Sequence, residues 1–421
     1  MLMKKKKGAV SLYIVLFATL LVTVIALGFT RIMMNERRQV SDTDLSQTAY
    51  DSAMTGIEDA KLAVLRYNEC LSTGNLYPSG STTRTCADIA SVMRTGQPTA
   101  GSINTCDGVA YVLGRVIDPE TPIQEGGASN TTYEQTDQAY TCVRVSDDTI
   151  DFLSTLDAQT RSRLIPLRTG EAEFNQIVIS WSRSRNGVST AGLPGATTGG
   201  NPPIRLPESW PATAPPVLSA SLIQTANSFT LSQFETANGS STNRAAMMLV
   251  PVASGGSNTI AASAAATLTN PGGVAETNDQ KTNNPFPITC ANPIGGDYSC
   301  SVTINLPNPI GGSRSSTHDG TSFLLLESIY PITAHDFQVR VQRNGTVVPL
   351  VGVQVAVDST GRNSDSLRRI EGRIEVVDTA YPYPEWTVQL NGEAGASFCK
   401  NFMVTINNWI TNQNVYDKSN C

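Results

Sequence analysis

The sequence predicts an α+β protein in which one long N-terminal helix precedes a head rich in β-strands. Two observations carry this prediction. From Ala9 to Thr30 the chain has no charge and no proline, and apolar residues at steps of three and four continue to Tyr67. The later chain consists of short β-patterned runs between loops of Gly, Asn, Pro and Ser, which is typical of antiparallel sheets and sandwiches.

The composition agrees with an exported, β-rich protein. Only 16% of the 421 residues are charged, which is low for a cytosolic enzyme. The net charge is −6, and four of the 30 basic residues are Lys4 to Lys7, so the remaining chain is more acidic still. This balance gives no general attraction to nucleic acid.

The stretch 9–30 is long enough to cross a membrane. About 22 residues at 1.5 Å each match a hydrocarbon core of about 30 Å. Four lysines precede the stretch, so the positive-inside rule places the N-terminus in the cytoplasm and the later chain outside. A secretory signal cleaved near Ala-Leu-Gly at 26–28 is an alternative, although this apolar stretch is longer than a signal peptide needs.

Residues 31–69 are expected to continue the same helix. The segment contains no proline, and its apolar residues recur at a spacing that forms one stripe on a helix, while the residues between them are mostly charged or polar. The stripe consists of Tyr50, Ala53, Met54, Ile57, Ala60, Val64 and Tyr67. The two segments together predict one rod from about residue 10 to 68, on the order of 85 Å long.

This N-terminal region resembles the type IV pilins. The resemblance covers roughly residues 1–69 and rests on the basic leader MLMKKKKG, the small residue after it, the uninterrupted apolar stretch and the amphipathic continuation to a cysteine-containing head. The run GAVSLYIVLFATLLVTVIALGFTRIMMNERRQ is most similar to minor pilins of the PilX type. The resemblance implies that a prepilin peptidase removes the leader 1–8 after Gly8 and leaves Ala9 as the mature N-terminus. It also implies that the transmembrane helix leaves the membrane to pack with other pilin subunits.

One position departs from the pilin pattern. Major pilins carry Glu as the fifth mature residue, where it pairs with the N-terminal amine of a neighbouring subunit, and the fifth residue here is Tyr13. A buried amine without a carboxylate partner is strongly destabilising. The departure therefore argues against a major pilin and favours a minor one.

Beyond the rod, the sequence predicts two domains separated by a linker. Residues 70–186 are expected to form a pilin-like antiparallel sheet that covers the helix stripe. Residues 187–216 are dominated by Pro and Gly and indicate a linker. Residues 217–421 carry regularly spaced strand patterns that predict a C-terminal β-sandwich.

Within these domains several local patterns predict individual elements. The first domain contains strand patterns at 109–117, 139–145 and 174–183 and a helical pattern at 147–165, whose acidic start and basic end suit the helix dipole. The second contains a two-residue hairpin turn at Asn344-Gly345 and a long, Ser- and Ala-rich loop over 253–285. Trp181, Trp386 and Trp409 are expected in the core, and Trp210 at an exposed contact.

All eight cysteines follow the apolar stretch. They are Cys70, Cys86, Cys106, Cys142, Cys290, Cys300, Cys399 and Cys421. The even number and the absence of a C-x-x-C pair favour disulfides formed outside the cytoplasm over a zinc site. Cys290 is predicted to pair with Cys300 across a Gly-Gly turn. Of the three pairings open to the first four, local spacing favours Cys70–Cys86 with Cys106–Cys142, and the resemblance to pilin heads favours a loop closed by Cys399 and Cys421.

The sequence offers no motif for catalysis. His318 and His335 are each followed by Asp, but neighbours on a strand point to opposite faces, so a His-Asp relay is disfavoured. The loop at 358–366 places Asp358, Asn363 and Asp365 at short spacing, as a calcium site would, although a plain polar hairpin is favoured. We therefore expect no enzyme, no cofactor and no metal.

Two functions fit these observations. The first is a minor pilin-like structural subunit of a type IV pilus, held in the membrane by a single pass and then displayed on the cell surface, where its β-rich head serves adhesion or assembly priming. The alternative is a single-span membrane-anchored surface protein or adhesin that never enters a filament. An exported hydrolase is a third and weaker hypothesis. The surface ligand in the first two is not encoded in any motif.

Overall fold

The computed structural model describes residues 9–73, 85–97, 104–114, 138–170, 172–183, 187–195, 210–224, 244–261, 284–291, 298–311, 322–330, 333–363 and 366–376. These residues form an α+β structure, as the sequence predicts. They fall into two compact units. The helix unit lies within Met1–Val145 and Val357–Gly372, and the sheet unit lies within Ser146–Ala356 and Arg373–Cys421.

The helices precede the strands along the described chain. The helices are α1 Ala9–Thr73, α2 Cys86–Thr95 and α3 Gly108–Leu113. The strands are β1 Gln138–Thr149, β2 Phe152–Leu156, β3 Ser162–Leu167, β4 Glu173–Arg183, β5 Val217–Gln224, β6 Arg244–Val252, β7 Thr259–Ala261, β8 Asn284–Thr289, β9 Tyr298–Gly311, β10 Ser322–Tyr330, β11 His335–Arg343, β12 Thr346–Val348, β13 Leu350–Asn363 and β14 Ser366–Glu375.

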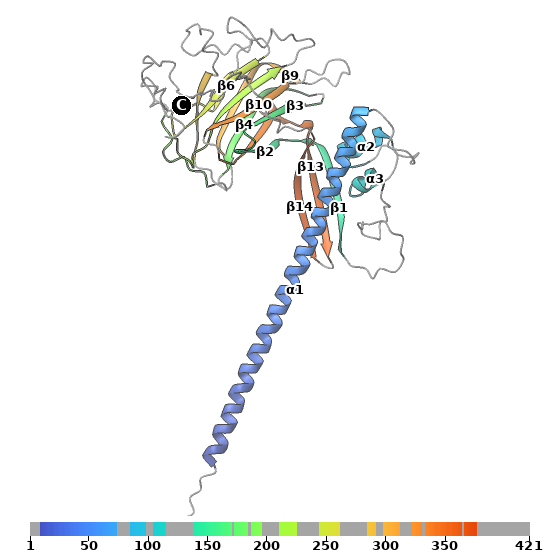
Figure 1. Ribbon diagram of the computed structural model, residues 1–421, viewed down its shortest axis with the longest axis vertical. Helices are drawn as coiled ribbons and strands as arrows, with labels where there is room; N and C mark the ends of the chain where they lie inside the picture. Colours follow the sequence, from blue (N-terminus) through green and yellow to red (C-terminus); the bar gives the residue numbers. More distant parts are fainter. Residues whose placement is uncertain are drawn as a thin grey trace, which may run out of the picture. The chain divides into compact units, whose positions relative to one another are not determined.

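The predicted rod is confirmed as one unbroken helix. α1 contains 65 residues, which corresponds to about 98 Å. Figure 1 shows α2, α3, β13 and β14 beside its C-terminal half, whereas its N-terminal half stands clear of the other elements of the helix unit. The absence of proline and the continuous run of helix-compatible residues explain why the apolar and amphipathic segments join without a break.

In the helix unit, α1 is covered by a sheet of order β1-β13-β14 and by two short helices. α2 begins with a capping box between Thr85 and Asp88 and ends at Gly96 in the left-handed conformation. α3 ends in the same way at Gly114. The prediction of a strand at 109–117 is wrong, because its first residues form the helix α3 between Asp107 and Gly114. Residues 115–117 lie outside the described residues.

The sheet unit contains a five-stranded sheet of order β3-β10-β5-β6-β8 and a larger sheet of order β12-β11-β4-β9-β7, with β2 also paired to β11. Most strand pairs are antiparallel, but β6 with β8 and β7 with β9 are parallel. Buried side chains of both sheets form one hydrophobic cluster. Its largest fully buried members are Trp181, Phe152, Phe174 and Phe337, so the expectation that Trp181 lies in the core is confirmed.

The structure divides the chain elsewhere than at the predicted linker. Strands β2, β3 and β4, which the sequence assigned to residues 70–186, pair with β11, β10 and β9 of the second predicted domain. The described parts of the predicted linker pack into the same core, where Leu193 and Trp210 are 7% and 6% exposed. The Trp210 ring meets Tyr330 edge-on at 5.5 Å, and its Nε1 donates to the Pro215 carbonyl at 3.1 Å. The expected exposed contact at Trp210 is therefore wrong.

Other local predictions met mixed outcomes. The helix expected at 147–165 is wrong, because this region forms the end of β1, all of β2 and the start of β3. The hairpin at Asn344-Gly345 is confirmed, with both residues at positive φ and β11 paired to β12 across them. The loop expected over 253–285 is interrupted by β7 and by the start of β8, and its residues 262–283 lie outside the described residues, as do Trp386 and Trp409.

Candidate assembly interface on the N-terminal helix

The N-terminal part of α1 is an apolar surface without a partner in the described structure. Every residue from Tyr13 to Asp44 is exposed, and the part up to Thr30 carries no charge and forms the apolar surface. The exposed fraction reaches 74% at Tyr13 and 70% at Leu27. α1 is long and apolar enough to cross a membrane. So large an apolar surface is not left in water by a soluble protein, so it requires lipid or another protein around it.

The polar side chains within this surface are satisfied by the helix itself. The Thr23 hydroxyl donates to the Thr19 carbonyl at 2.9 Å, and the Thr30 hydroxyl donates to the Ala26 carbonyl at 2.8 Å. The Thr19 hydroxyl donates to the Leu16 carbonyl at 3.0 Å. These bonds leave no free hydroxyl donor at the three threonines, which suits an apolar environment.

Tyr13 lies on this surface, where the pilin resemblance places the missing Glu. It borders a shallow apolar hollow together with Ile14, Phe17 and Leu21. Apolar side chains of this kind pack readily against another apolar helix, whereas the hydroxyl of Tyr13 needs a polar partner or water. Gly8 lies outside the described residues, and Ala9 is the first residue of α1.

The C-terminal part of α1 fixes the helix to its own sheet. Ala49, Ala53 and Ala60 are fully buried, and these small side chains let β13 approach the helix backbone. A Cβ added at Gly361 would overlap the Ala49 carbonyl oxygen and the Ala53 amide nitrogen. The predicted stripe is confirmed at Ala53, Ile57, Ala60, Val64 and Tyr67, which are all buried, whereas Tyr50 remains 44% exposed.

Two buried hydrogen bonds add to this contact. The Ser359 hydroxyl donates to the Ala53 carbonyl at 2.7 Å. The Tyr140 hydroxyl donates to the Asp59 carboxylate at 2.6 Å. Ser359 and Gly361 were not expected at this contact, because both fall in the loop considered for calcium. The available signal was the small-residue pattern Ser-Thr-Gly opposite an alanine-rich helix stripe.

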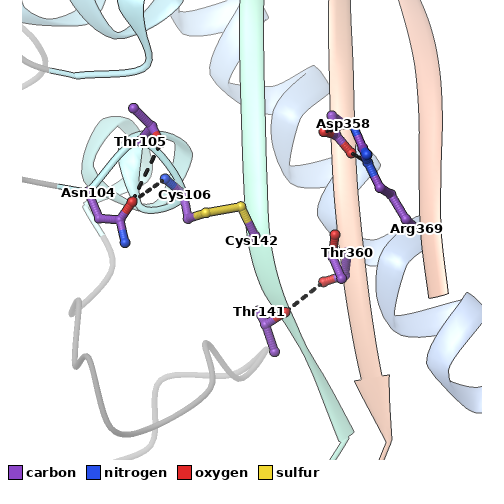
Figure 2. The surroundings of a disulfide bond; sticks show 8 residues. All are labelled: Asn104, Thr105, Cys106, Thr141, Cys142, Asp358, Thr360 and Arg369. Atoms are coloured by element: carbon purple, nitrogen blue, oxygen red, sulfur yellow. Dashed lines mark hydrogen bonds and ion pairs between the residues drawn. A yellow bond between two sulfur atoms is a disulfide. The ribbon is translucent and has the colours of Figure 1, made fainter. Parts of the chain in front are cut away.

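Three predicted disulfides are confirmed. Cys70–Cys86 joins the end of α1 to α2, and Cys106–Cys142 joins the turn before α3 to β1. Figure 2 shows the second bridge beside the hydrogen bond from Thr141 to the Thr360 carbonyl, which links β1 to β13. Cys290–Cys300 lies in the sheet unit. Cys399 and Cys421 lie outside the described residues, so that pairing stays a prediction.

Among the residues considered for calcium, Asp358 is paired with an arginine on the neighbouring strand. Asp358 accepts two hydrogen bonds of 2.6 Å from Arg369 on the neighbouring strand (Figure 2). These hydrogen bonds and the charge of Asp358 raise the pKa of Arg369. Asn363 borders a groove on α1, and Asp365 lies outside the described residues. Among the described residues, no group of three or more His, Cys, Asp and Glu side chains is placed to hold a metal.

The described histidine is a buried structural residue. His335 is 4% exposed, and its ring contacts the Ser182 and Thr333 hydroxyls. The neighbouring Asp336 accepts a hydrogen bond from Thr155 instead, as the alternation along a strand predicts. Burial lowers the pKa of His335 to about 4, with the Asp336 charge opposing the shift. His318 lies outside the described residues.

Comparisons with known proteins add no identification. No family model matches this chain, and no curated protein and no solved structure matches it either.

Proposed function

We propose that this chain is a minor pilin-like subunit of a type IV pilus. One observation carries the proposal: α1 is a single helix that exposes an apolar surface from Tyr13 onward and buries its C-terminal half against the head. Such a helix crosses a membrane before assembly and packs among other subunit helices afterwards. The head, meaning everything after α1, is then carried outside.

The length of the exposed part supports a filament over a simple anchor. A span needs about 20 residues, yet side chains stay exposed through Asp44, 14 residues or about 21 Å beyond Thr30. A plain anchor has no use for this additional unpartnered helix. Tyr13 supports a minor subunit, because the chain cannot supply the carboxylate that a continuous shaft of its own copies would need.

The head is proposed to serve adhesion or assembly priming on the cell surface. The three disulfides support an oxidising compartment outside the cytoplasm. We further infer that the two sheets of the sheet unit face each other as a β-sandwich, an arrangement supported by their shared hydrophobic cluster. The partners of the chain are the prepilin peptidase, the membrane before assembly and other pilin subunits through α1.

N-terminal sequencing of the mature protein and analysis of sheared filaments test this proposal. We expect Ala9 as the first residue and the protein as a minor component of the filament fraction. Gly8→Trp should leave an unprocessed precursor in the membrane, because the peptidase needs a small residue at this position. A mature protein that begins at Met1 and is absent from filaments supports the membrane-anchored surface protein. A start near Phe29 indicates ordinary secretion, and an unchanged mature mass in Gly8→Trp refutes the pilin proposal.

A further inference from the structure

The hairpin turn between β11 and β12 consists of an Asn-Gly pair, which is a chemically labile sequence. Asn344 and Gly345 are both at positive φ and both exposed to water. In such a pair the backbone nitrogen of the glycine can attack the side-chain amide carbon of the asparagine, because glycine has no Cβ to hinder the approach. The turn is therefore a candidate site of spontaneous modification.

Two consecutive side chains of β4 bind the two groups that would react. The Gly345 N–H donates to Gln176 Oε1 at 2.7 Å. The Asn175 Nδ2 donates to Asn344 Oδ1 at 2.8 Å, and the Asn344 N–H donates to Asn175 Oδ1 at 2.9 Å. The attacking nitrogen and the amide that it would attack are thus each held by a neighbouring strand rather than free to meet.

The start of β4 is arranged to present these two amides to the turn. Gln176 lies opposite Gln342 on β11 and Asn305 on β9. Its Nε2 donates to Asn305 Oδ1 at 2.9 Å, so the orientation that offers Oε1 to the turn is fixed from the other side. The register of β4 with β9 shifts between Phe174 and Gln176, and a bulge of this kind re-aims the side chain of the extra residue, here Asn175.

We propose that Asn344 is a deamidation site and that Gln176 and Asn175 slow the reaction in the folded protein. The Gly345 nitrogen gives up its proton and bonds to Asn344 Cγ, the Cγ–Nδ2 bond breaks, and ammonia leaves with that proton. Water then opens the cyclic imide at either carbonyl to give aspartate or isoaspartate. The hydrogen bond to Gln176 favours the protonated nitrogen and so opposes the first step.

The modification would act on the edge of the larger sheet. β12 is the terminal strand in its order, and it pairs with β11 alone. The geometry of a two-residue turn sets the register of a hairpin, and isoaspartate adds a backbone atom to this turn. Deamidation is therefore expected to loosen β12, a consequence that does not depend on the role of α1 in assembly.

Peptide mapping by mass spectrometry of the detergent-solubilised full chain, kept in mildly alkaline buffer, tests the proposal. We expect aspartate and isoaspartate to accumulate at position 344 about fivefold faster in Gln176→Met than in the parent, as the loss of one hydrogen bond allows. Gln342→Met is the matched control in the same cross-strand row, and its rate should stay within about twofold of the parent. In urea the parent should react faster than when folded and at the same rate as Gln176→Met.

A second variant and a check of the fold keep the result decisive. Asn175→Ala removes the other clamp and should also raise the rate at Asn344, while hydrogen exchange in β4 and β11 shows whether each variant keeps the sheet. Folded and urea-treated parent reacting at one rate, or unchanged rates in both Gln176→Met and Asn175→Ala, would overturn the proposal. An equal rise in Gln342→Met would also overturn it, because the cause would then be a loosened sheet.

Discussion

At the scale of single residues, the join between α1 and β13 depends on the absence of side chains. Gly361 and Gly56 lie where a Cβ would strike backbone or the Ser359 side chain across the interface. This closeness allows the Ser359 hydroxyl to reach the Ala53 carbonyl. A buried hydroxyl that donates to a helix carbonyl contributes only about 1 kcal/mol, so exclusion of larger side chains is the stronger constraint.

Gly361→Ala should therefore destabilise the helix unit. The added methyl group would overlap the α1 backbone at Ala49 and Ala53, and overpacking of this kind costs about 1 to 3 kcal/mol. Thermal unfolding of the detergent-solubilised full chain measures the effect. Thr360→Ala, one residue earlier on the opposite face of β13, is the matched control and should change the midpoint little. Equal midpoints for Gly361→Ala and the parent would contradict the close approach.

His335 predicts a loss of stability in mild acid. Its pKa is about 4 in the folded protein against 6.5 for a free histidine, so between these values the unfolded chain binds more protons than the folded one. Stability is then fully present above pH 6.5 and falls as the pH drops toward 4, by about 3 kcal/mol at most. Urea unfolding at pH 7, 5.5 and 4 measures this change. His335→Gln, which stays neutral, should show a shallower dependence, and parallel curves would count against the assignment.

At the scale of elements, the sequence predicted those structures whose signals are local. α1 follows from an unbroken proline-free pattern, and the β11–β12 hairpin follows from Asn344-Gly345. The segment 147–165 was misassigned because its helix-like charges are local, whereas its actual partners on β10 and β11 lie more than 150 residues away. The domain boundary failed for the same reason, since Pro and Gly around Trp210 do not reveal that this ring is buried by Tyr330.

The disulfides were predictable from spacing because each closes a short loop between adjacent elements. Cys70→Ser with Cys86→Ser opens a link across 16 residues, which should destabilise by about 3 kcal/mol through the unfolded state. We expect faster hydrogen exchange in α2, which this bridge holds against α1. Cys290→Ser with Cys300→Ser is the comparison pair and should raise exchange in β9 instead. Unchanged protection of α2 would show that packing alone holds it.

At the scale of the whole molecule, each of the two compact units is built from two separate stretches of the chain. β1 and β13 each begin or end in one unit and continue in the other, so neither unit is a continuous stretch of sequence. A linear reading of domains from residue 70 onward could not find this arrangement. The candidate interface on α1 was more accessible to prediction, because exposure of an apolar helix depends on its own sequence rather than on distant strands.

The behaviour of the assembled molecule should depend on Tyr13. A helix that lacks the pairing carboxylate should enter filaments only beside subunits that have one, so the chain expressed alone should remain monomeric in the membrane. Tyr13→Glu supplies a charge that can pair with a neighbouring N-terminal amine and should raise the ratio of this protein to the major subunit in purified filaments. Tyr13→Phe is the control, because it keeps the apolar ring and adds no charge. Abundant homopolymers of the parent protein would contradict the minor-subunit proposal, and a ratio unchanged by Tyr13→Glu would show that another feature of α1 limits incorporation.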